Sequence, residues 1–191
     1  MEENVMELNK KMANPAPLGL LGFGMTTVML NLCNVGIIEL SSAIVAMGIA
    51  IGGLAQIIAG IFDMQQGNTF GGTAFTAYGL FWISTVFIWV NPFEEIIFGA
   101  DEISLGFYML LWGIFTLFMF IAARKKSVAL RMVFLTLTIL FFGLAASEFT
   151  GIEIILIISG IVGIVCGATA IYTALGTVIN EEYCKEVIKL C

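Results

Sequence analysis

Long apolar runs alternate with short polar connections along the whole chain. A transmembrane helix needs about 20 apolar residues, because each adds about 1.5 Å and the hydrocarbon core of a bilayer is about 30 Å thick. Six runs come close to this length or exceed it: 17–33, 40–62, 70–90, 103–123, 127–146 and 152–179. The pattern therefore predicts an all-α membrane protein with six transmembrane helices. The predicted connections are 34–39, 63–69, 91–102, 124–126 and 147–151.

The composition agrees with an apolar solvent around the protein. Of the 191 residues, 60% are hydrophobic and 12% are charged, and the mean hydropathy is +1.04. Soluble domains carry about 25% charged residues, and a soluble chain of this size could not bury so much apolar surface. A lipid bilayer is therefore an expected partner. The net charge of −6 offers no basic surface, so nucleic acid is not expected as a partner.

Charged residues sort between the two sides of the predicted helices. The basic residues precede the first run, join the fourth to the fifth, or follow the last: Lys10, Lys11, Arg124, Lys125, Lys126, Arg131, Lys185 and Lys189. The alternate connections carry acids: Glu39, Glu94, Glu95, Asp101, Glu102, Glu148 and Glu153. Basic residues favour the cytoplasmic side. We therefore expect both termini in the cytoplasm, with tails 1–13 and 181–191 around a transmembrane domain 14–180 in the cell (plasma) membrane.

Residue types that carry chemistry are few. The chain has no histidine, and its four cysteines form no CxxC pair, so neither a metal site nor a cofactor is expected. The sequence contains no evident nucleophile–base pair, so we expect no enzyme. No ionisable residue lies near the middle of a predicted span. This argues against the buried carboxylate relay of many ion-coupled carriers.

Small residues form stripes on two predicted helices. They are Gly160, Gly163, Gly167, Ala170 and Ala174 in run 152–179, and Gly48, Gly52 and Gly60 in run 40–62. Such stripes favour close packing of helices, within or between subunits, over a pore lining. Gln56 continues the second stripe. Its amide needs a hydrogen-bonding partner on another helix or in a wet path.

Hydroxyl groups cluster on the first, third and fifth predicted helices: Thr26 and Thr27, then Thr69, Thr73 and Thr76, then Thr136 and Thr138. A single threonine most often bonds to the backbone of its own helix, whereas such clusters would suit a polar path. Two helix starts, 14–20 and 67–71, would offer free N–H groups and a positive helix end to an anion. Asn14 is the expected N-cap of the first helix.

The same two helix starts carry a resemblance to a known family. Residues 14–20 read Asn-Pro-Ala-Pro-Leu-Gly-Leu, and the match continues through 22–27 and 30–32. It resumes at 67–71, 73–76, 78–79, 81–82, 111–113, 115–120, 166–168 and 170–172. Together these segments resemble the acetate uptake transporter family, which includes the succinate–acetate permeases.

The resemblance implies a homohexamer in which each six-helix subunit has its own path. It implies uptake of acetate and, in some members, succinate, by proton symport or channel-like permeation. A hydrophobic gate would consist of Phe23, Tyr78 and Leu137. Polar substrate-binding groups beside it would be Asn14, Thr26, Thr27, Gln56, Asn68, Thr69, Thr73 and Thr76. Cys33 stands where many relatives have a histidine, which puts proton coupling through an imidazole in doubt for this chain.

Other interpretations remain open from the sequence. The chain divides into three helix pairs, with Gly-Ile-Phe at 60–62 and again at 113–115, which suggests a three-hairpin pseudo-repeat. A compact six-helix design would also suit a channel for urea, short amides or other small neutral solutes. A non-transporting scaffold or sensor is a third interpretation. Competition by urea and absence of flux, respectively, would distinguish these two from acetate transport.

Overall fold

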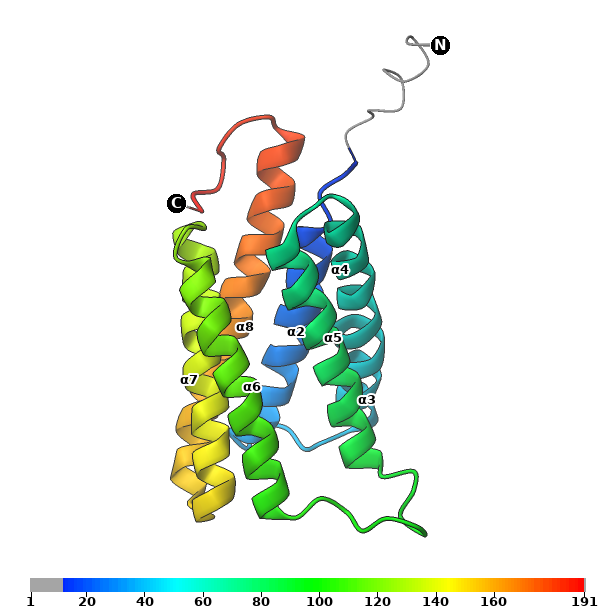
Figure 1. The fold of residues 1–191 in the computed structure, drawn as a ribbon. Helices are drawn as coiled ribbons and strands as arrows, with labels where there is room; N and C mark the ends of the chain where they lie inside the picture. Colours follow the sequence, from blue (N-terminus) through cyan, green and yellow to red (C-terminus); the bar gives the residue numbers. More distant parts are fainter. Residues whose placement is uncertain (1–11, 191) are drawn as a thin grey trace.

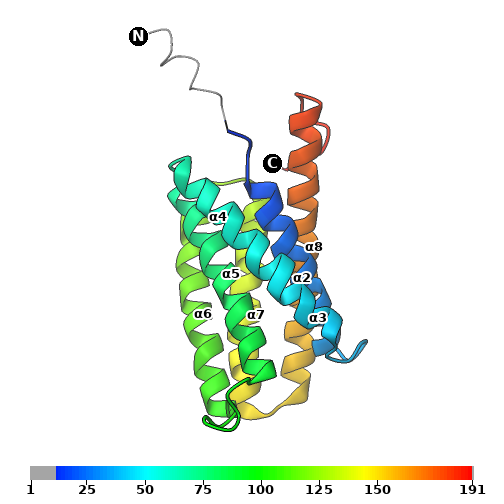
Figure 2. The same ribbon diagram turned by 90° about the vertical axis from the view of Figure 1, so that its right-hand side faces the viewer.

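Long helices make up most of residues 12–190, which the computed structural model describes (Figures 1 and 2). They are α2 (Ala16–Asn34), α3 (Ser42–Met47) continuing through the π-helix η1 (Gly48–Ala55) into α4 (Gln56–Gln65), α5 (Thr69–Val90), α6 (Glu102–Ala123), α7 (Val128–Thr150) and α8 (Glu153–Glu182). Over this range they form six segments long and apolar enough to cross a membrane. The predicted all-α, six-span fold is therefore confirmed.

Capping residues explain several helix boundaries. The side chains of Asn68, Asp101 and Ser127 accept hydrogen bonds from backbone N–H groups at the starts of α5, α6 and α7. At the start of α2 the cap position belongs to Pro15, although the Oδ1 atom of Asn14 accepts a bond of 3.0 Å from the N–H of Ala16. Asn14 therefore lies one residue before the N-cap, which corrects the prediction that it is the N-cap itself. Its side chain still accepts a backbone hydrogen bond at this helix start.

Two segments differ from the sequence-based prediction. The predicted connection 63–69 is shorter in the structure, because α4 continues to Gln65 and α5 begins at Thr69. This places Asp63 inside a helix. The second span also changes its winding, because residues Gly48–Ala55 form a π-helix that the apolar pattern did not indicate. A π-helix widens the turn and rotates the side chains that follow it relative to an unbroken α-helix.

The helices form a ring in the spatial order α2, α8, α7, α6, α5 and α4. Neighbouring backbones are close around most of this ring, whereas α5 and α6 are farther apart. Aromatic side chains fill the space between these two helices. The Phe81 ring lies 5.8 Å from that of Tyr108 and 5.1 Å from that of Trp112, centroid to centroid. The core thus includes an aromatic wall on the α5–α6 side.

The glycine stripe of α8 packs against α2. A Cβ atom at Gly167 would lie 2.7 Å from the carbonyl oxygen of Gly24, and one at Gly160 would lie 2.7 Å from the side chain of Val35. In the second span, Gly52 faces Thr26 and Trp82, while Gly60 faces Thr76. These glycines therefore serve helix packing within the subunit, as favoured from the sequence.

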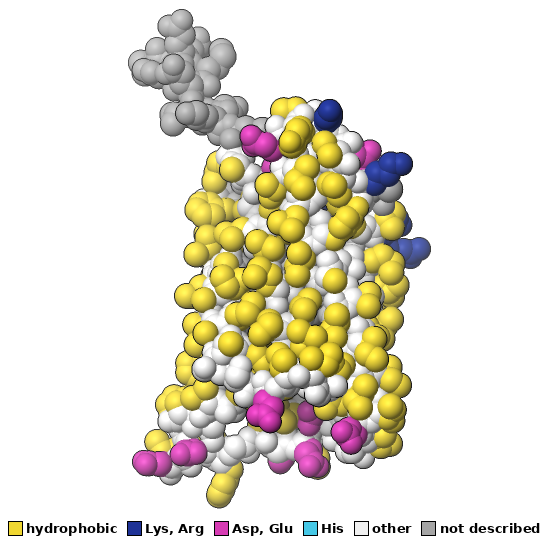
Figure 3. Space-filling model, turned by 180° about the vertical axis from the view of Figure 1, so that it is seen from behind, with side chains coloured by type: hydrophobic (Ala, Val, Ile, Leu, Met, Phe, Trp, Pro, Cys, Tyr) yellow, Lys and Arg dark blue, Asp and Glu magenta, His cyan; other side chains and the backbone are white. Residues whose placement is uncertain are grey.

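Charges lie at opposite ends of the bundle (Figure 3). We call the end where α2 begins and α8 finishes the terminal end, and the other the distal end. The basic residues of the described range lie at the terminal end, and the acids of the 34–39, 91–102 and 147–153 segments lie at the distal end. Lys10 and Lys11 lie outside the described residues. Which end faces the cytoplasm stays a prediction.

Candidate functional site

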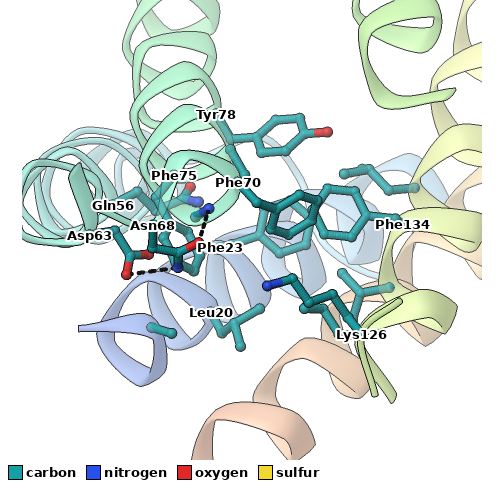
Figure 4. Close-up of a pocket in the computed structure, with 16 residues that line it drawn as sticks. Leu20, Phe23, Gln56, Asp63, Asn68, Phe70, Phe75, Tyr78, Lys126 and Phe134 are labelled. Atoms are coloured by element: carbon teal, nitrogen blue, oxygen red, sulfur yellow. Dashed lines mark hydrogen bonds between the residues drawn. The ribbon is translucent and has the colours of Figure 1, made fainter. Parts of the chain in front are cut away.

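A cavity of about 160 Å³ lies between the helices, toward the terminal end (Figure 4). Its walls come from α2, α4, α5, α7 and the α6–α7 turn. The lining residues are Ala16, Leu20, Phe23, Gln56, Asp63, Asn68, Phe70, Gly71, Ala74, Phe75, Tyr78, Lys126, Leu130, Val133, Phe134 and Leu137. A cavity of about 150 Å³ holds a benzene-sized molecule. A short carboxylic acid would therefore fit in this mostly apolar space.

The structure brings the three expected gate residues together. Phe23, Tyr78 and Leu137 all line the cavity, and each is at least 95% buried. The rings of Phe23 and Tyr78 lie 5.9 Å apart, centroid to centroid. Phe23 and Leu137 also line a second space of about 20 Å³ nearer the distal end. These two side chains therefore form a wall shared by the two cavities.

Tyr78 is held in place by a residue that the sequence analysis did not select. Its hydroxyl lies 2.9 Å from Oγ1 of Thr116, which is fully buried on α6. Thr116 donates its own proton to the carbonyl oxygen of Trp112, 2.7 Å away. Since Thr116 has one proton to give, Tyr78 is the donor in their shared bond. This bond and the flanking Phe115 ring, 5.4 Å from the Tyr78 ring, orient Tyr78.

Three of the eight expected polar groups line the two spaces. Gln56 and Asn68 line the larger cavity, and Thr27 lines the smaller one. Gln56 is 1% exposed and lines the larger cavity, so its surroundings are an internal space as well as the neighbouring helices. Thr26 is also buried, but its hydroxyl donates to the carbonyl oxygen of Gly22 at 2.9 Å and packs against Gly52. Thr26 therefore supports the contact between α2 and η1.

The other four polar groups lie outside both spaces. Asn14 donates to Oε1 of Glu181 at 2.7 Å and lines a groove between α2 and α8. Thr69 and Thr73 are exposed on the outer face of α5. Thr76 is half-buried against Gly60 of α4. The role of these four in substrate binding stays a prediction, and the structure gives them positions away from the cavity.

Asp63 and Lys126 belong to the larger cavity although the sequence analysis placed both in connections. Asp63 is 3% exposed, and its Oδ1 atom accepts a bond of 3.0 Å from Nδ2 of Asn68. Lys126 extends over the ring of Phe70, with Nζ 5.2 Å from the centroid. A signal for Asp63 was available, because it lies two helical turns after Gln56 and shares its face. Asp63 lies two residues before the end of α4, so it does not contradict the expectation that no ionisable residue lies near the middle of a span, but its burial was not expected.

Two buried atoms of this cavity are acceptors without a donor. Within the described range, neither Oε1 of Gln56 nor Oδ2 of Asp63 has a hydrogen-bond partner. Buried polar atoms are nearly always paired in folded proteins. The cavity is thus suited to a molecule, or a water, that brings a hydrogen-bond donor.

Comparison with known proteins gives one consistent family. Residues 3–189 match the model of the GPR1/FUN34/yaaH family. The chain is 49% identical over 182 residues to the succinate-acetate/proton symporter SatP of Escherichia coli (strain K12), covering 95% of this chain and 97% of that protein. It is 34% identical over 179 residues to ammonia transport outward protein 2 of Saccharomyces cerevisiae, covering 90% and 64%. The solved structure of the bacterial acetate channel SatP matches with a TM-score of 0.93 at 49% identity, covering 95% of this chain and all of the other.

Proposed function

The chain belongs to the GPR1/FUN34/yaaH family. We propose that it carries acetate, and also succinate, across the cell membrane through the interior of its six-helix bundle. The family membership confirms the resemblance found in the sequence segments. The relatives support the same function, because they include a succinate-acetate/proton symporter and an acetate channel.

The observation that best supports this function is that two internal spaces share the side chains of Phe23 and Leu137 as a common wall. A hydrated inorganic ion would have to shed water at this apolar point, where nothing replaces its hydration shell. Acetate has a methyl group that tolerates an apolar wall and a carboxyl group that Gln56 and Asn68 can bind. Movement of the Phe23 ring would connect the two spaces.

Flux into proteoliposomes tests this function. Purified protein is reconstituted, and radiolabelled acetate uptake is measured down a fixed acetate gradient, with protein-free liposomes subtracted to remove the passive leak of acetic acid. We expect protein-dependent uptake that unlabelled succinate inhibits. An imposed pH gradient with a protonophore control then distinguishes coupled symport from passive permeation. Absence of protein-dependent acetate flux would overturn the proposal and favour a non-transporting role.

A neutral-solute channel is the second candidate. The two unpaired acceptors, Gln56 Oε1 and Asp63 Oδ2, would also suit the N–H groups of urea or a short amide. Urea added in excess to the acetate assay separates the candidates. We expect acetate uptake to be unchanged by urea, and inhibition by urea would favour the neutral-solute function.

The proposal extends to orientation and assembly. We propose that both termini face the cytoplasm, since the basic terminal end follows the charge bias of cytoplasmic segments. We propose a homohexamer with one path per subunit. The broad apolar outer surface would then face lipid and neighbouring subunits (Figure 3). A role in transport, and none in catalysis, agrees with the functions of these relatives.

A further inference from the structure

The larger cavity contains one buried carboxyl group. Asp63 enters from α4, and Figure 4 shows it beside Asn68 on one side of the cavity, with Lys126 on the other. Oδ1 of Asp63 accepts a hydrogen bond from Nδ2 of Asn68. Oδ2 lies against Gly71 and has no hydrogen-bond partner in the described range. Gly71 also lines the cavity, and no larger residue could stand there without displacing the carboxyl group.

The unpaired oxygen of Asp63 restricts its hydrogen-bond partner more strictly than the unpaired oxygen of Gln56 does. An amide can rotate by 180° and offer N–H in place of C=O, so Gln56 can serve a donor or an acceptor. A carboxylate has acceptors only, and it becomes a donor only by binding a proton. Oδ2 of Asp63 therefore requires either a donor from the cavity or a proton of its own.

A substrate carboxylate in this cavity would meet the carboxylate of Asp63. Two such groups that share a site of low polarity do not both stay ionised, and the pair retains one proton. Among the residues that line the cavity, the other titratable groups are Tyr78 of α5 and Lys126 of the α6–α7 turn, while α2 and α7 contribute none. Lys126 is exposed and lies over the Phe70 ring, and it brings the one positively charged side chain among the residues that line the cavity.

We propose that Asp63 is the proton-binding residue of the transport path. With a substrate carboxylate in the cavity, one proton taken from water on the side of higher acidity is held between Oδ2 of Asp63 and a substrate oxygen. The proton leaves to water on the other side together with the substrate, and Asp63 returns to its starting state. Acetate and one proton then cross together without net charge. This assignment rests on the proposed function and adds to it the residue that couples substrate and proton.

The test compares Asp63→Asn with the unmodified protein in proteoliposomes, with a membrane potential set by a potassium gradient and valinomycin. Acetate uptake by the unmodified protein should be indifferent to the potential and driven by a pH gradient, with accumulation approaching about tenfold for one pH unit. Asp63→Asn should still pass acetate, but as the anion. Its uptake should rise with an inside-positive potential and lose the extra accumulation driven by pH.

Two variants control for the substitution. Asp63→Glu keeps a carboxyl group and should retain indifference to the potential. Glu39→Gln removes one exposed acid at the distal end and should behave like the unmodified protein. If Asp63→Asn remains indifferent to the potential, Asp63 is not the proton-binding residue. If the unmodified protein shows no acetate flux at all, the proposed function fails first.

A second measurement decides the matter if Asp63→Asn is inactive or misfolded. Infrared difference spectra of the unmodified protein are recorded on addition of acetate and of ¹³C-acetate. We expect a protonated-carboxyl C=O band that the isotope in the substrate does not shift, and that moves or disappears in Asp63→Glu. If every C=O band that appears shifts with the isotope, the proton is on the substrate alone and the proposal is overturned.

Discussion

At the scale of single residues, a few buried side chains separate the two internal spaces. Phe23 and Leu137 form the wall between the two spaces, and Tyr78 stands beside them with its hydroxyl bonded to Thr116. The wall is apolar, whereas the amides of Gln56 and Asn68 lie on its terminal side. If the wall selects acids by size and the amides bind the carboxyl group, as proposed, substitutions should separate these two effects.

Substitution of the shared wall should relax size selection. In Phe23→Ala the two spaces merge, so we expect larger acids such as butyrate to compete for acetate uptake more strongly than in the unmodified protein. Stability should fall as well, by about 3–5 kcal/mol for loss of a buried ring. The measurement is competition of labelled acetate uptake by acids of increasing length. Phe118→Ala, at a ring that is 66% exposed on α6, is the control, and equal acid preferences in both variants would refute the gate assignment.

Loss of the Tyr78 anchor should cost stability. Thr116→Val removes the acceptor of the Tyr78 hydroxyl and leaves it unpaired inside the bundle. We expect the free energy of unfolding to fall by about 1–3 kcal/mol, measured by thermal or denaturant unfolding in detergent. Thr169→Val is the matched control, because the hydroxyl of Thr169 bonds only to Val165 of its own helix. If the free energy of unfolding falls as much in Thr169→Val, the hydrogen bond between Thr116 and Tyr78 does not stabilise the protein more than a bond within one helix.

At the scale of elements, the ring of helices closes by two different kinds of contact. α2 and α8 approach backbone to backbone through Gly24 and Gly167, whereas aromatic side chains fill the wider space between α5 and α6. Without a hydrophobic drive inside lipid, close packing and van der Waals contact provide most of the association between helices. The glycine contact should therefore tolerate no side chain.

A bulky residue at the α2–α8 contact should separate the helices. A Cβ atom at Gly167 would already lie within 2.7 Å of the Gly24 carbonyl oxygen. Gly167→Leu is expected to destabilise the fold by about 1–3 kcal/mol or more, as overpacking of a filled core does. Thermal unfolding in detergent measures this loss. Ala168→Leu places the same side chain on the exposed face of α8 and should leave the unfolding temperature nearly unchanged.

At the scale of the whole molecule, charge defines two different ends. Within the described range, the terminal end carries the basic residues, and seven of the eleven acids lie at the distal end (Figure 3). Because positively charged segments favour the cytoplasmic side, this asymmetry predicts that the terminal end faces the cytoplasm. In this predicted orientation the larger cavity, with Asp63 and Lys126, lies toward the cytoplasm.

The orientation can be tested with a native cysteine. Cys184 is exposed just after α8, so a variant that keeps only this cysteine carries a label site at the terminal end. A membrane-impermeant maleimide should label it in inverted vesicles and leave it unlabelled in intact cells. A companion variant with Glu39→Cys as its single cysteine should show the reverse pattern. Labelling of Cys184 from outside the cell would overturn the predicted topology.

Sequence alone determined the features that depend on local composition. Six apolar runs of sufficient length specify six helices, since a backbone in lipid must satisfy its hydrogen bonds within each helix. The separation of basic and acidic segments is likewise a property of order along the chain. The residues of the gate trio were named from the family resemblance, and the structure placed them side by side.

Only the tertiary structure decided which side chains face the interior. The rotation of each helix about its axis follows from packing against neighbours, and in an apolar span no hydrophobic periodicity reports it. Thr69 and Thr73 consequently lie outside, Gln56 and Asn68 lie inside, and Asp63 is buried although its segment is polar enough to be taken for a connection. The apolar runs along the chain thus determine the six helices. The cavity and its carboxyl group instead arise from contacts between segments that are distant in the chain.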